Sequence, residues 1–527
     1  MSTKGSKPAG GIGERMLSFF WPKPAETVAE RARRRISLHL IPFLFFLYIL
    51  SFLDRVNVSV AQLGMNEPPL AASVATAVGL GAAAHGAGPL LGMSGLLAGR
   101  ADPIGTGGLG FDPSIIGLGF GIFFLGYWIL EVPSTVFVVK WGARWVFARI
   151  LVLWGLCATL FGAMGTPLAA ALLGWLPHGD NPEYQFYALR FLLGFFEGGF
   201  FPSVIVYLSY WFRAEDRGKA IACFMIAIPV SSVVGNPLSG VLLGVHWFGL
   251  AGWRWIFIVE GVAPVLAGFA TLFLLPDRPA KARWLPADER EWLRTELEQE
   301  HRLKQTQGHG ALLHHVGMVG LLTAVYFCLN VSGYGLTSSL PPIIKSLSDV
   351  SDQRASFLAA LPYGVALIAM LVNGWHSDRT GERFWHAALP LALLSVGLGL
   401  TAWLIRVPVW PVVILIVVVG AGMYAYLPAF WPIPTMFLGA TLAAVAIGLI
   451  NMIGNLGGFL GPYIVGSLAS GNADKTRYAS SLSFLVLFPL ISAVTVLIVG
   501  YSRHRLLSKQ PTLPEPDAVP LPPIPSP

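Results

Sequence analysis

The chain contains 527 residues, of which 54% are hydrophobic and only 12% are charged. Soluble domains carry about 25% charged residues, and the mean hydropathy here is +0.64. This composition excludes a soluble enzyme with a large core and indicates an integral membrane protein. The net charge of +7 does not indicate nucleic-acid binding, because the basic residues lie in short runs between apolar segments, as the positive-inside rule places them.

Twelve apolar segments are long enough to cross a bilayer as helices, which takes about 20 residues. The pattern therefore predicts an all-α membrane protein with twelve transmembrane helices. The expected spans are 36–60, 115–139, 144–166, 185–212, 218–243, 253–275, 313–339, 355–376, 385–405, 409–433, 440–469 and 479–501. The first span follows a basic cluster and is too long for a cleavable signal peptide, so we expect it to be retained.

The basic residues also predict the orientation of the chain. Lys140 and Arg144 lie between the second and third spans, Arg213 and Arg217 between the fourth and fifth, and Arg503 after the last. These connections are expected on the cytoplasmic side, which places both termini in the cytoplasm of a cell whose inner membrane the chain crosses. An additional span within the Gly- and Ala-rich stretch 66–112 would invert every later connection, so we expect a long outward-facing loop there.

The spans divide into two halves. Residues 1–35 form a cytoplasmic tail, 36–275 a first bundle of six helices, and 313–502 a second bundle of six helices. The polar stretch 276–312 between them reads as a cytoplasmic linker with a surface helix over 288–300, and 503–527 form a Pro-rich cytoplasmic tail. Two six-helix bundles joined in this way are typical of a transporter with its binding site near the midplane.

An acid and a base stand side by side in the first span, at Asp54 and Arg55. An ionised side chain at membrane depth costs at least about 3 kcal/mol on insertion scales. Such a pair is retained when the two groups neutralise each other, face a watery cavity, or both. We expect Asp54 and Arg55 to line a solute pathway.

The fourth span carries a second acid and base, at Arg190 and Glu197. The two residues are two helical turns apart and share a face. Gly194, Gly198 and Gly199 permit close approach of a neighbouring helix. A carboxyl group between desolvation and a nearby arginine can gain and lose a proton during transport. The alternative is a static ion pair that holds the first and fourth spans together.

Helical spacing adds candidates for the wall of the same cavity. Tyr48 shares a face with Arg55, and Tyr127 lies in the second span, where it could donate a hydrogen bond into the cavity. Glu131 is as well suited to gating or helix-end pairing as to substrate contact, and Glu260 is a further acid without an assigned partner. In the second half neutral groups replace the charges, and the candidates there are Asn330, Tyr334, Trp431, Asn451 and Asn455. Interhelical hydrogen bonds remain an alternative role for each of them.

A charged loop joins the eighth and ninth spans. It contains Gly374, Asp378, Arg379, Gly381 and Arg383. The glycines allow a tight turn, and the charges can bridge helix ends in one transport state, so we expect a gating role. Its counterpart between the second and third spans runs over 140–144.

Several motifs together resemble a known family. The loop Gly374-Trp-His-Ser-Asp-Arg-Thr-Gly-Glu-Arg383 is similar to the signature of the major facilitator superfamily. Asp54-Arg55-Val-Asn57, Phe195-Phe-Glu-Gly-Gly-Phe-Phe-Pro202, Pro276-Asp-Arg-Pro279 and the run 451–463 resemble its anion:cation symporter family. That family includes bacterial tartrate, phthalate and sugar-acid carriers.

The resemblance implies roles for individual residues. Asp54 and Glu197 would be the protonation sites, and Arg55 would meet the carboxylate of the substrate. Arg190 would partner Glu197, and Tyr127 would contact the substrate.

The sequence thus predicts a proton-coupled symporter, a monomer in the lipid bilayer that imports a small organic anion, a mono- or dicarboxylate, by alternating access. The alternatives are a uniporter or antiporter with structural ion pairs, or a membrane solute sensor. No nucleotide-binding loop or metal-binding helix motif indicates an enzyme. Cys157, Cys223 and Cys328 each lie in an apolar run without disulfide or metal spacing, so we expect no metal and no cofactor.

Overall fold

The computed structural model describes residues 27–68, 107–306, 316–348, 350–405, 409–438, 440–471 and 476–508. Within these residues every regular element is a helix, and twelve helices are long and apolar enough to cross a membrane. The prediction of an all-α membrane protein with twelve spanning helices is therefore confirmed. Residues 69–106 of the expected loop and 307–312 at the end of the linker lie outside the described residues. Most of both tails lies outside them as well.

The first six spans are α2 (Val28–Met65), α5 (Pro113–Trp141), α6 (Ala143–Phe161), α8 with α9 (Pro182–Glu197 and Phe200–Ser209), α10 (Ala214–Leu243) and α11 (Gly252–Leu274). The last six are α13 (Val316–Ser348), α14 (Asp352–Thr380), α15 (Phe384–Leu404), α16 with α17 (Val409–Ala425 and Leu427–Phe430), α18 with α19 (Ala440–Gly454 and Gly457–Ala469), and α20 with α21 (Ala479–Leu485 and Leu487–Ser508). Short helices connect some of them, including α7 (Pro167–Leu173).

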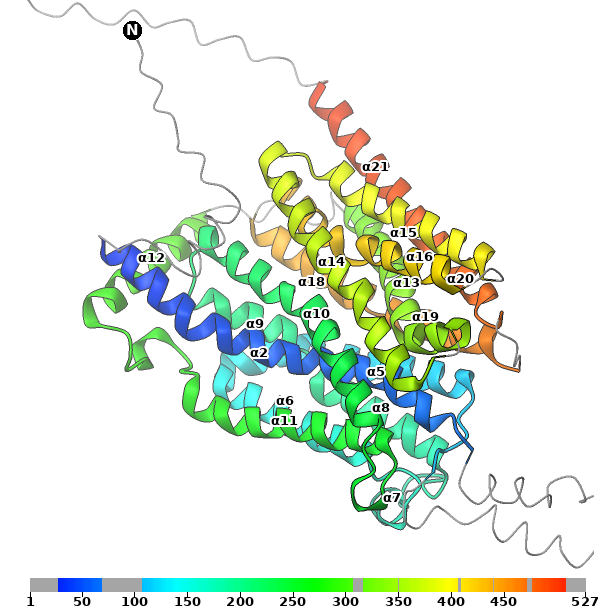
Figure 1. The fold of residues 1–527 in the computed structure, drawn as a ribbon. Coiled ribbons are helices and arrows are strands. Elements are labelled where there is room, and N and C mark those ends of the chain that lie inside the picture. Colours follow the sequence, from blue (N-terminus) through cyan, green and yellow to red (C-terminus); the bar gives the residue numbers. More distant parts are fainter. Residues whose placement is uncertain are drawn as a thin grey trace, which may run out of the picture.

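The helices form two bundles that lie side by side (Figure 1). We call the end of the molecule with the start of α2 and with α12 (Ala287–Thr306) the linker end, and the end with Met65 and Pro113 the opposite end. The surface helix expected over 288–300 is α12, which is longer than expected. Its acids bind arginines of the first bundle, with Arg35 Nε 3.0 Å from Glu289 Oε2 and Arg213 Nη1 2.9 Å from Glu296 Oε2. The linker is thus fastened to the first half.

Small residues let the two bundles meet closely between α5 and α19. A Cβ atom on Gly117 would lie 2.3 Å from the carbonyl oxygen of Pro462, and one on Gly466 would lie 2.3 Å from that of Pro113. Real side chains do not approach so closely, so only glycine fits at these positions. We call this contact between α5 and α18–α19 the seam; it closes the opposite end of the molecule.

Two further contacts join the bundles near the opposite end. Gln62 donates from its amide nitrogen Nε2 to the carbonyl oxygen of Ser338 at 2.6 Å, which links α2 to α13. Ser356 of α14 donates to the carbonyl oxygen of Asn236 of α10, also at 2.6 Å. The two halves are therefore joined at the opposite end of the molecule.

The seam generates a first prediction. Replacing Gly466 with Val should lower the apparent melting temperature of the purified protein by several degrees, because the added methyl groups cannot fit with the seam closed. Gly448→Val is the matched control, because nothing lies within 4 Å of the added Cβ atom in α18. Equal melting temperatures for the two variants would contradict the close packing described here.

Candidate functional site

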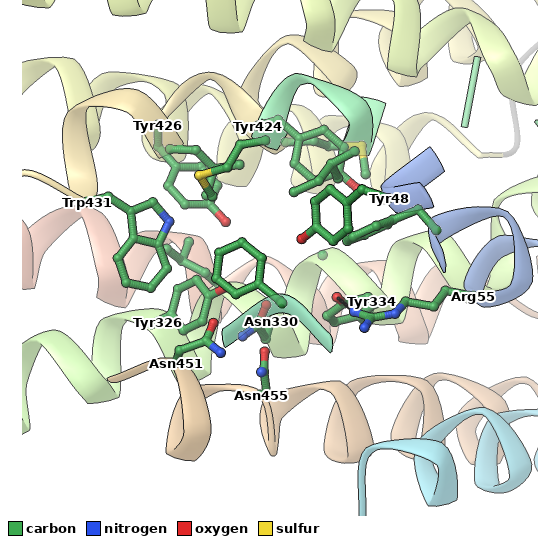
Figure 2. A pocket seen from close by; sticks show the side chains of 18 of the residues that line it. Tyr48, Arg55, Tyr326, Asn330, Tyr334, Tyr424, Tyr426, Trp431, Asn451 and Asn455 are labelled. Atoms are coloured by element: carbon green, nitrogen blue, oxygen red, sulfur yellow. Dashed lines mark hydrogen bonds between the residues drawn. The ribbon is translucent and has the colours of Figure 1, made fainter. Parts of the chain in front are cut away.

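A cavity of about 70 Å³ lies between the two bundles, at the level of Arg55 (Figure 2). Eight of the residues proposed from the sequence line it, namely Tyr48, Arg55, Tyr127, Asn330, Tyr334, Trp431, Asn451 and Asn455. Arg55 is the one charged side chain among the lining residues. A volume of this size holds a few water molecules, so an organic solute would require the halves to move apart.

Three tyrosines of the second half that line the cavity were missed by the sequence analysis, namely Tyr326, Tyr424 and Tyr426. Tyr326 could have been found, because Tyr326, Asn330 and Tyr334 follow one another at four-residue intervals and share a face of α13. Tyr424 and Tyr426 lie where α16 ends and α17 begins. Regular helical spacing does not extend across that break, so no pattern pointed to them.

Arg55 forms a buried ion pair with Glu197. Its Nε and Nη2 atoms donate to Glu197 Oε1 at 2.9 and 2.6 Å, and Ser51 Oγ donates to the same oxygen at 2.6 Å. The side chains of Arg55 and Glu197 are 9% and 0% exposed. The remaining nitrogen, Nη1, lies 3.4 Å from the hydroxyl of Tyr334 in the second half. Arg55 therefore reaches from the first bundle into the cavity.

Aromatic rings surround the guanidinium group of Arg55. Its central carbon lies 4.8 Å from the ring centre of Phe52, 5.3 Å from that of Phe123 and 4.9 Å from that of Tyr127. A cation over the face of an aromatic ring is stabilised by the charge distribution of the ring. These rings and Glu197 hold the guanidinium in one place beside the cavity.

A break in the fourth span positions Glu197. α8 ends at Glu197, and α9 begins after Gly199, whose φ of +84° favours glycine. One turn earlier, a Cβ atom on Gly194 would lie 1.9 Å from the carbonyl oxygen of Phe123, so α8 and α5 are in direct backbone contact. The run of glycines seen in the sequence therefore brings the carboxylate to Arg55.

Asp54 points away from Arg55 and does not line the cavity. Successive helical side chains point about 100° apart, which directs Asp54 toward α6. There Trp154 Nε1 donates to Asp54 Oδ2 at 2.5 Å, and Asn57 Nδ2 donates to Oδ1 at 2.9 Å. The side chain is buried, with 1% of its surface exposed. Asp54 is thus held by neutral donors and forms no ion pair with Arg55, and of the two residues expected along the solute pathway only Arg55 lines the cavity in this structure.

Arg190 does not pair with Glu197 in this structure, contrary to the expectation from the resemblance. It donates from Nε to the carbonyl oxygen of Gly119 at 3.1 Å, and it lies over the rings of Phe120 and Phe123. Seven residues of helix separate the two positions by about 10 Å along the axis. Arg55, which comes from α2 at the level of Glu197, forms the ion pair instead of Arg190. Arg190 is buried and does not line the cavity.

Two further acids are buried in the spanning region. Glu260 of α11 accepts a hydrogen bond from Ser239 Oγ at 2.7 Å, and Asn57 lies between it and Asp54. Glu131 of α5 accepts one from Asn451 Nδ2 of α18 at 2.5 Å, across the seam. Neither acid pairs with a base there.

The charged loop between α14 and α15 is held within its own half. α14 ends at Thr380 and is followed by Gly381, whose φ is +71°. Arg383 Nη1 lies 2.7 Å from Asp378 Oδ1 and also donates to Ser377 Oγ. Arg379 lies over the ring of Trp375, and a Cβ atom on Gly374 would touch Pro428.

The equivalent loop of the first half is tied to Pro276–Pro279. The backbone N–H of Arg144 donates to Asp277 Oδ1 at 3.2 Å, and a Cβ atom on Gly142 would lie 2.6 Å from the same oxygen. The charges of both loops thus join helix ends inside each bundle in this conformation. A bridge in another transport state stays a prediction.

The described residues contain no group of three or more His, Cys, Asp or Glu side chains suited to a metal ion. The side chains that line the cavity offer one guanidinium group, three amides, phenol hydroxyls and an indole, together with apolar groups.

Comparison with known proteins agrees with this geometry. The family model of the Major Facilitator Superfamily matches residues 44–462. A putative tartrate transporter of Agrobacterium vitis is 37% identical over 474 residues, which are 89% of this chain and 95% of that protein. A quinolone resistance transporter of Acinetobacter baumannii is 33% identical over 461 residues, 87% of this chain and 93% of that protein.

Solved structures match the fold. The crystal structure of a D-xylose-proton symporter has a TM-score of 0.62 at 14% sequence identity, and the match covers 87% of this chain and 97% of that one. The resemblance drawn from the motifs is confirmed. The chain, a multi-pass membrane protein and not an enzyme, belongs to the major facilitator superfamily of transporters.

Proposed function

We propose that the protein is a proton-coupled symporter that imports a small organic anion, a mono- or dicarboxylate, by alternating access. The observation that carries this proposal is Arg55, the one charged side chain that lines the cavity between the halves. A guanidinium group binds a carboxylate through charge-assisted, often paired hydrogen bonds. The name of the Agrobacterium vitis relatives, putative tartrate transporter, supports an organic anion as the substrate class.

The ion pair supplies a reason for coupling to protons. Arg55 and Glu197 neutralise each other in this structure. A substrate carboxylate that binds Arg55 adds a negative charge next to Glu197, and like charges at this distance repel strongly in a low-dielectric site. Protonation of Glu197 removes that repulsion and frees the guanidinium nitrogens for the substrate. Asp54, held by Trp154 and Asn57, serves as the second protonation site.

The second half shapes the substrate. Asn330, Asn451 and Asn455 offer donors and acceptors, while Tyr326, Tyr334 and Trp431 offer apolar surface with polar edges. Amide and phenol groups can hydrogen-bond to hydroxyl groups and so distinguish hydroxy acids from carboxylates without hydroxyl groups. Because these groups are uncharged, the charge that faces the cavity comes from the first half.

We further propose that both termini are cytoplasmic, that the protein works as a monomer in the inner membrane, and that the loop with Asp378 and Arg383 gates the linker end. The basic residues of alternate connections support this orientation. In that orientation the present structure is closed toward the outside.

Neutralising Glu197 tests the coupling. Glu197→Gln should abolish pH-driven accumulation in proteoliposomes but spare counterflow exchange, because a permanently neutral residue still allows the anion to bind. Glu183→Gln near the start of α8, where the carboxylate of Glu183 accepts a hydrogen bond from the hydroxyl of Tyr187 at 2.8 Å, is the control and should accumulate normally. Full pH dependence of uptake in Glu197→Gln would refute the coupling assignment.

The role of Arg55 can be tested separately. Arg55→Lys should raise the KM for the carboxylate at least about tenfold, because lysine cannot form paired hydrogen bonds and keep its contact with Glu197. Arg294→Lys on the exposed face of α12 provides the matched control. A thermal-shift screen of mono- and dicarboxylates identifies the substrate to use, and an unchanged KM would remove Arg55 from the binding site.

A uniporter or antiporter with static ion pairs is the rival, and a protonophore separates the cases. Uptake into proteoliposomes with an imposed pH gradient should fall to the equilibrium level when the protonophore is added. Accumulation that persists with the pH gradient collapsed would favour the rival.

A further inference from the structure

Glu131 is a buried carboxyl group that the transport scheme above leaves without a role. It lies in α5, is 3% exposed, and faces the second half across the seam. Its Oε1 atom accepts a hydrogen bond from Asn451 Nδ2 at 2.5 Å. This bond joins the two bundles on the linker-end side of the glycine contacts Gly117–Pro462 and Gly466–Pro113.

The surroundings of Glu131 suit a neutral side chain better than a charged one. Asn451 is its one hydrogen-bond donor, and an amide is uncharged. Asn455, one turn along the helix, is close enough to act on the carboxyl group but does not meet hydrogen-bonding geometry, so Oε2 has no partner. Burial of a carboxylate with so few donors is unfavourable, whereas a neutral side chain loses much less solvation.

The charged and titratable groups that act on Glu131 come from three helices. They are Arg55 of α2, Tyr127 of α5 itself and Tyr326 of α13. Arg55 favours a negative charge nearby, but its own hydrogen bonds go to Glu197. The tyrosines are neutral at physiological pH. With the seam closed, Arg55 is therefore hydrogen-bonded to Glu197 and not to Glu131.

We propose that Glu131 is a further proton-binding group, whose protonation favours the conformation with the seam closed and whose ionisation favours the conformation with the seam parted. When the halves separate along α5 and α18–α19, water reaches the carboxyl group and solvates its charge. When they close, the group loses that water and keeps only Asn451. A group that binds a proton more tightly in one conformation must shift the equilibrium toward that conformation as the pH falls.

The proposal deepens the proposed function, because it adds a positioning residue that links proton binding to movement of the halves without touching the substrate. The proposal rests on proton-coupled transport only for the role that Glu131 would have in the cell. The conformational equilibrium itself exists without substrate, so it can be measured even if the substrate class or the role of Glu197 proves different.

The test uses the purified full-length protein in lipid nanodiscs without substrate. Spin labels are attached at Trp175→Cys and Arg354→Cys, two exposed positions at the opposite end on different halves. The native cysteines, Cys157, Cys223 and Cys328, are replaced by Ser. Distances between the labels are measured by double electron–electron resonance from pH 5 to pH 8.

In the otherwise native protein the ratio of closed to parted conformations should fall about tenfold or more as the pH rises through the titration of one group. Glu131→Gln keeps an acceptor for Asn451 but cannot ionise, so it should stay closed and lose most of this pH response. Asn451→Ala removes the donor and should lower the closed population at every pH while the pH response remains.

Glu197→Gln in the same labelled background is the control. It should retain the response that belongs to Glu131, displaced to lower pH because Arg55 is no longer held by a charged Glu197. The proposal is overturned if Glu131→Gln responds to pH as the native protein does, or if the response disappears in Glu197→Gln instead. It is likewise overturned if the native protein shows no response to pH. A normal melting temperature of Glu131→Gln confirms that its result reflects the lost charge; if that variant fails to fold, Glu131→Asp replaces it and should shift the response along the pH axis.

Discussion

The buried ion pair between Arg55 and Glu197 is the interaction on which the rest of the site depends. Two charges inside a membrane protein are costly unless they neutralise each other. Here Ser51 also donates to Glu197 Oε1, Tyr334 lies beside Arg55 Nη1, and three aromatic rings surround the guanidinium, while Glu197 Oε2 is buried without a hydrogen-bond partner. Glycines break the fourth span directly after Glu197, and Gly194 lets α8 pack against α5. Together they bring Glu197 within reach of Arg55. A change at the pair therefore alters both the cavity and the packing of the first bundle.

The two halves have different chemical tasks. The first bundle contains the ion pair between Arg55 and Glu197, and other arginines of this bundle form ion pairs with the linker helix α12. The charges of this half are therefore largely neutralised by groups of the same half and of the linker. The second bundle contributes amides and phenols to the cavity and glycines to the seam. Because the charge resides in one half and the neutral hydrogen-bonding groups in the other, a solute that contacts both must bridge the interface. Binding and movement of the halves are thereby connected.

The buried carboxyl groups of the first half fall into two kinds. Glu197 is paired with an arginine, whereas Asp54, Glu131 and Glu260 are held by indole, amide and hydroxyl donors. A carboxyl group beside a guanidinium keeps a strong electrostatic partner, while one among neutral donors depends on access to water for its charge. In the proposed mechanism, this difference separates Glu197, which competes with the substrate for Arg55, from carboxyl groups such as Glu131 that respond to conformational change.

Length, hydropathy and the spacing of residues by themselves predicted the twelve helices, their division into two bundles and eight of the nineteen residues that line the cavity. These are local properties: a span requires a run of apolar residues, and side chains seven apart on one helix share a face, as Tyr48 and Arg55 do. The partners of the charges were decided by the tertiary structure. The sequence set Asp54 beside Arg55, and the family resemblance paired Arg190 with Glu197. In the structure Glu197 binds Arg55, Asp54 binds Trp154, and Arg190 binds backbone carbonyl oxygens. Which donor reaches a carboxylate depends on how helices from distant parts of the chain pack and at what level along the membrane they cross, and the contact of Glu131 with Asn451 across the seam arises in the same way.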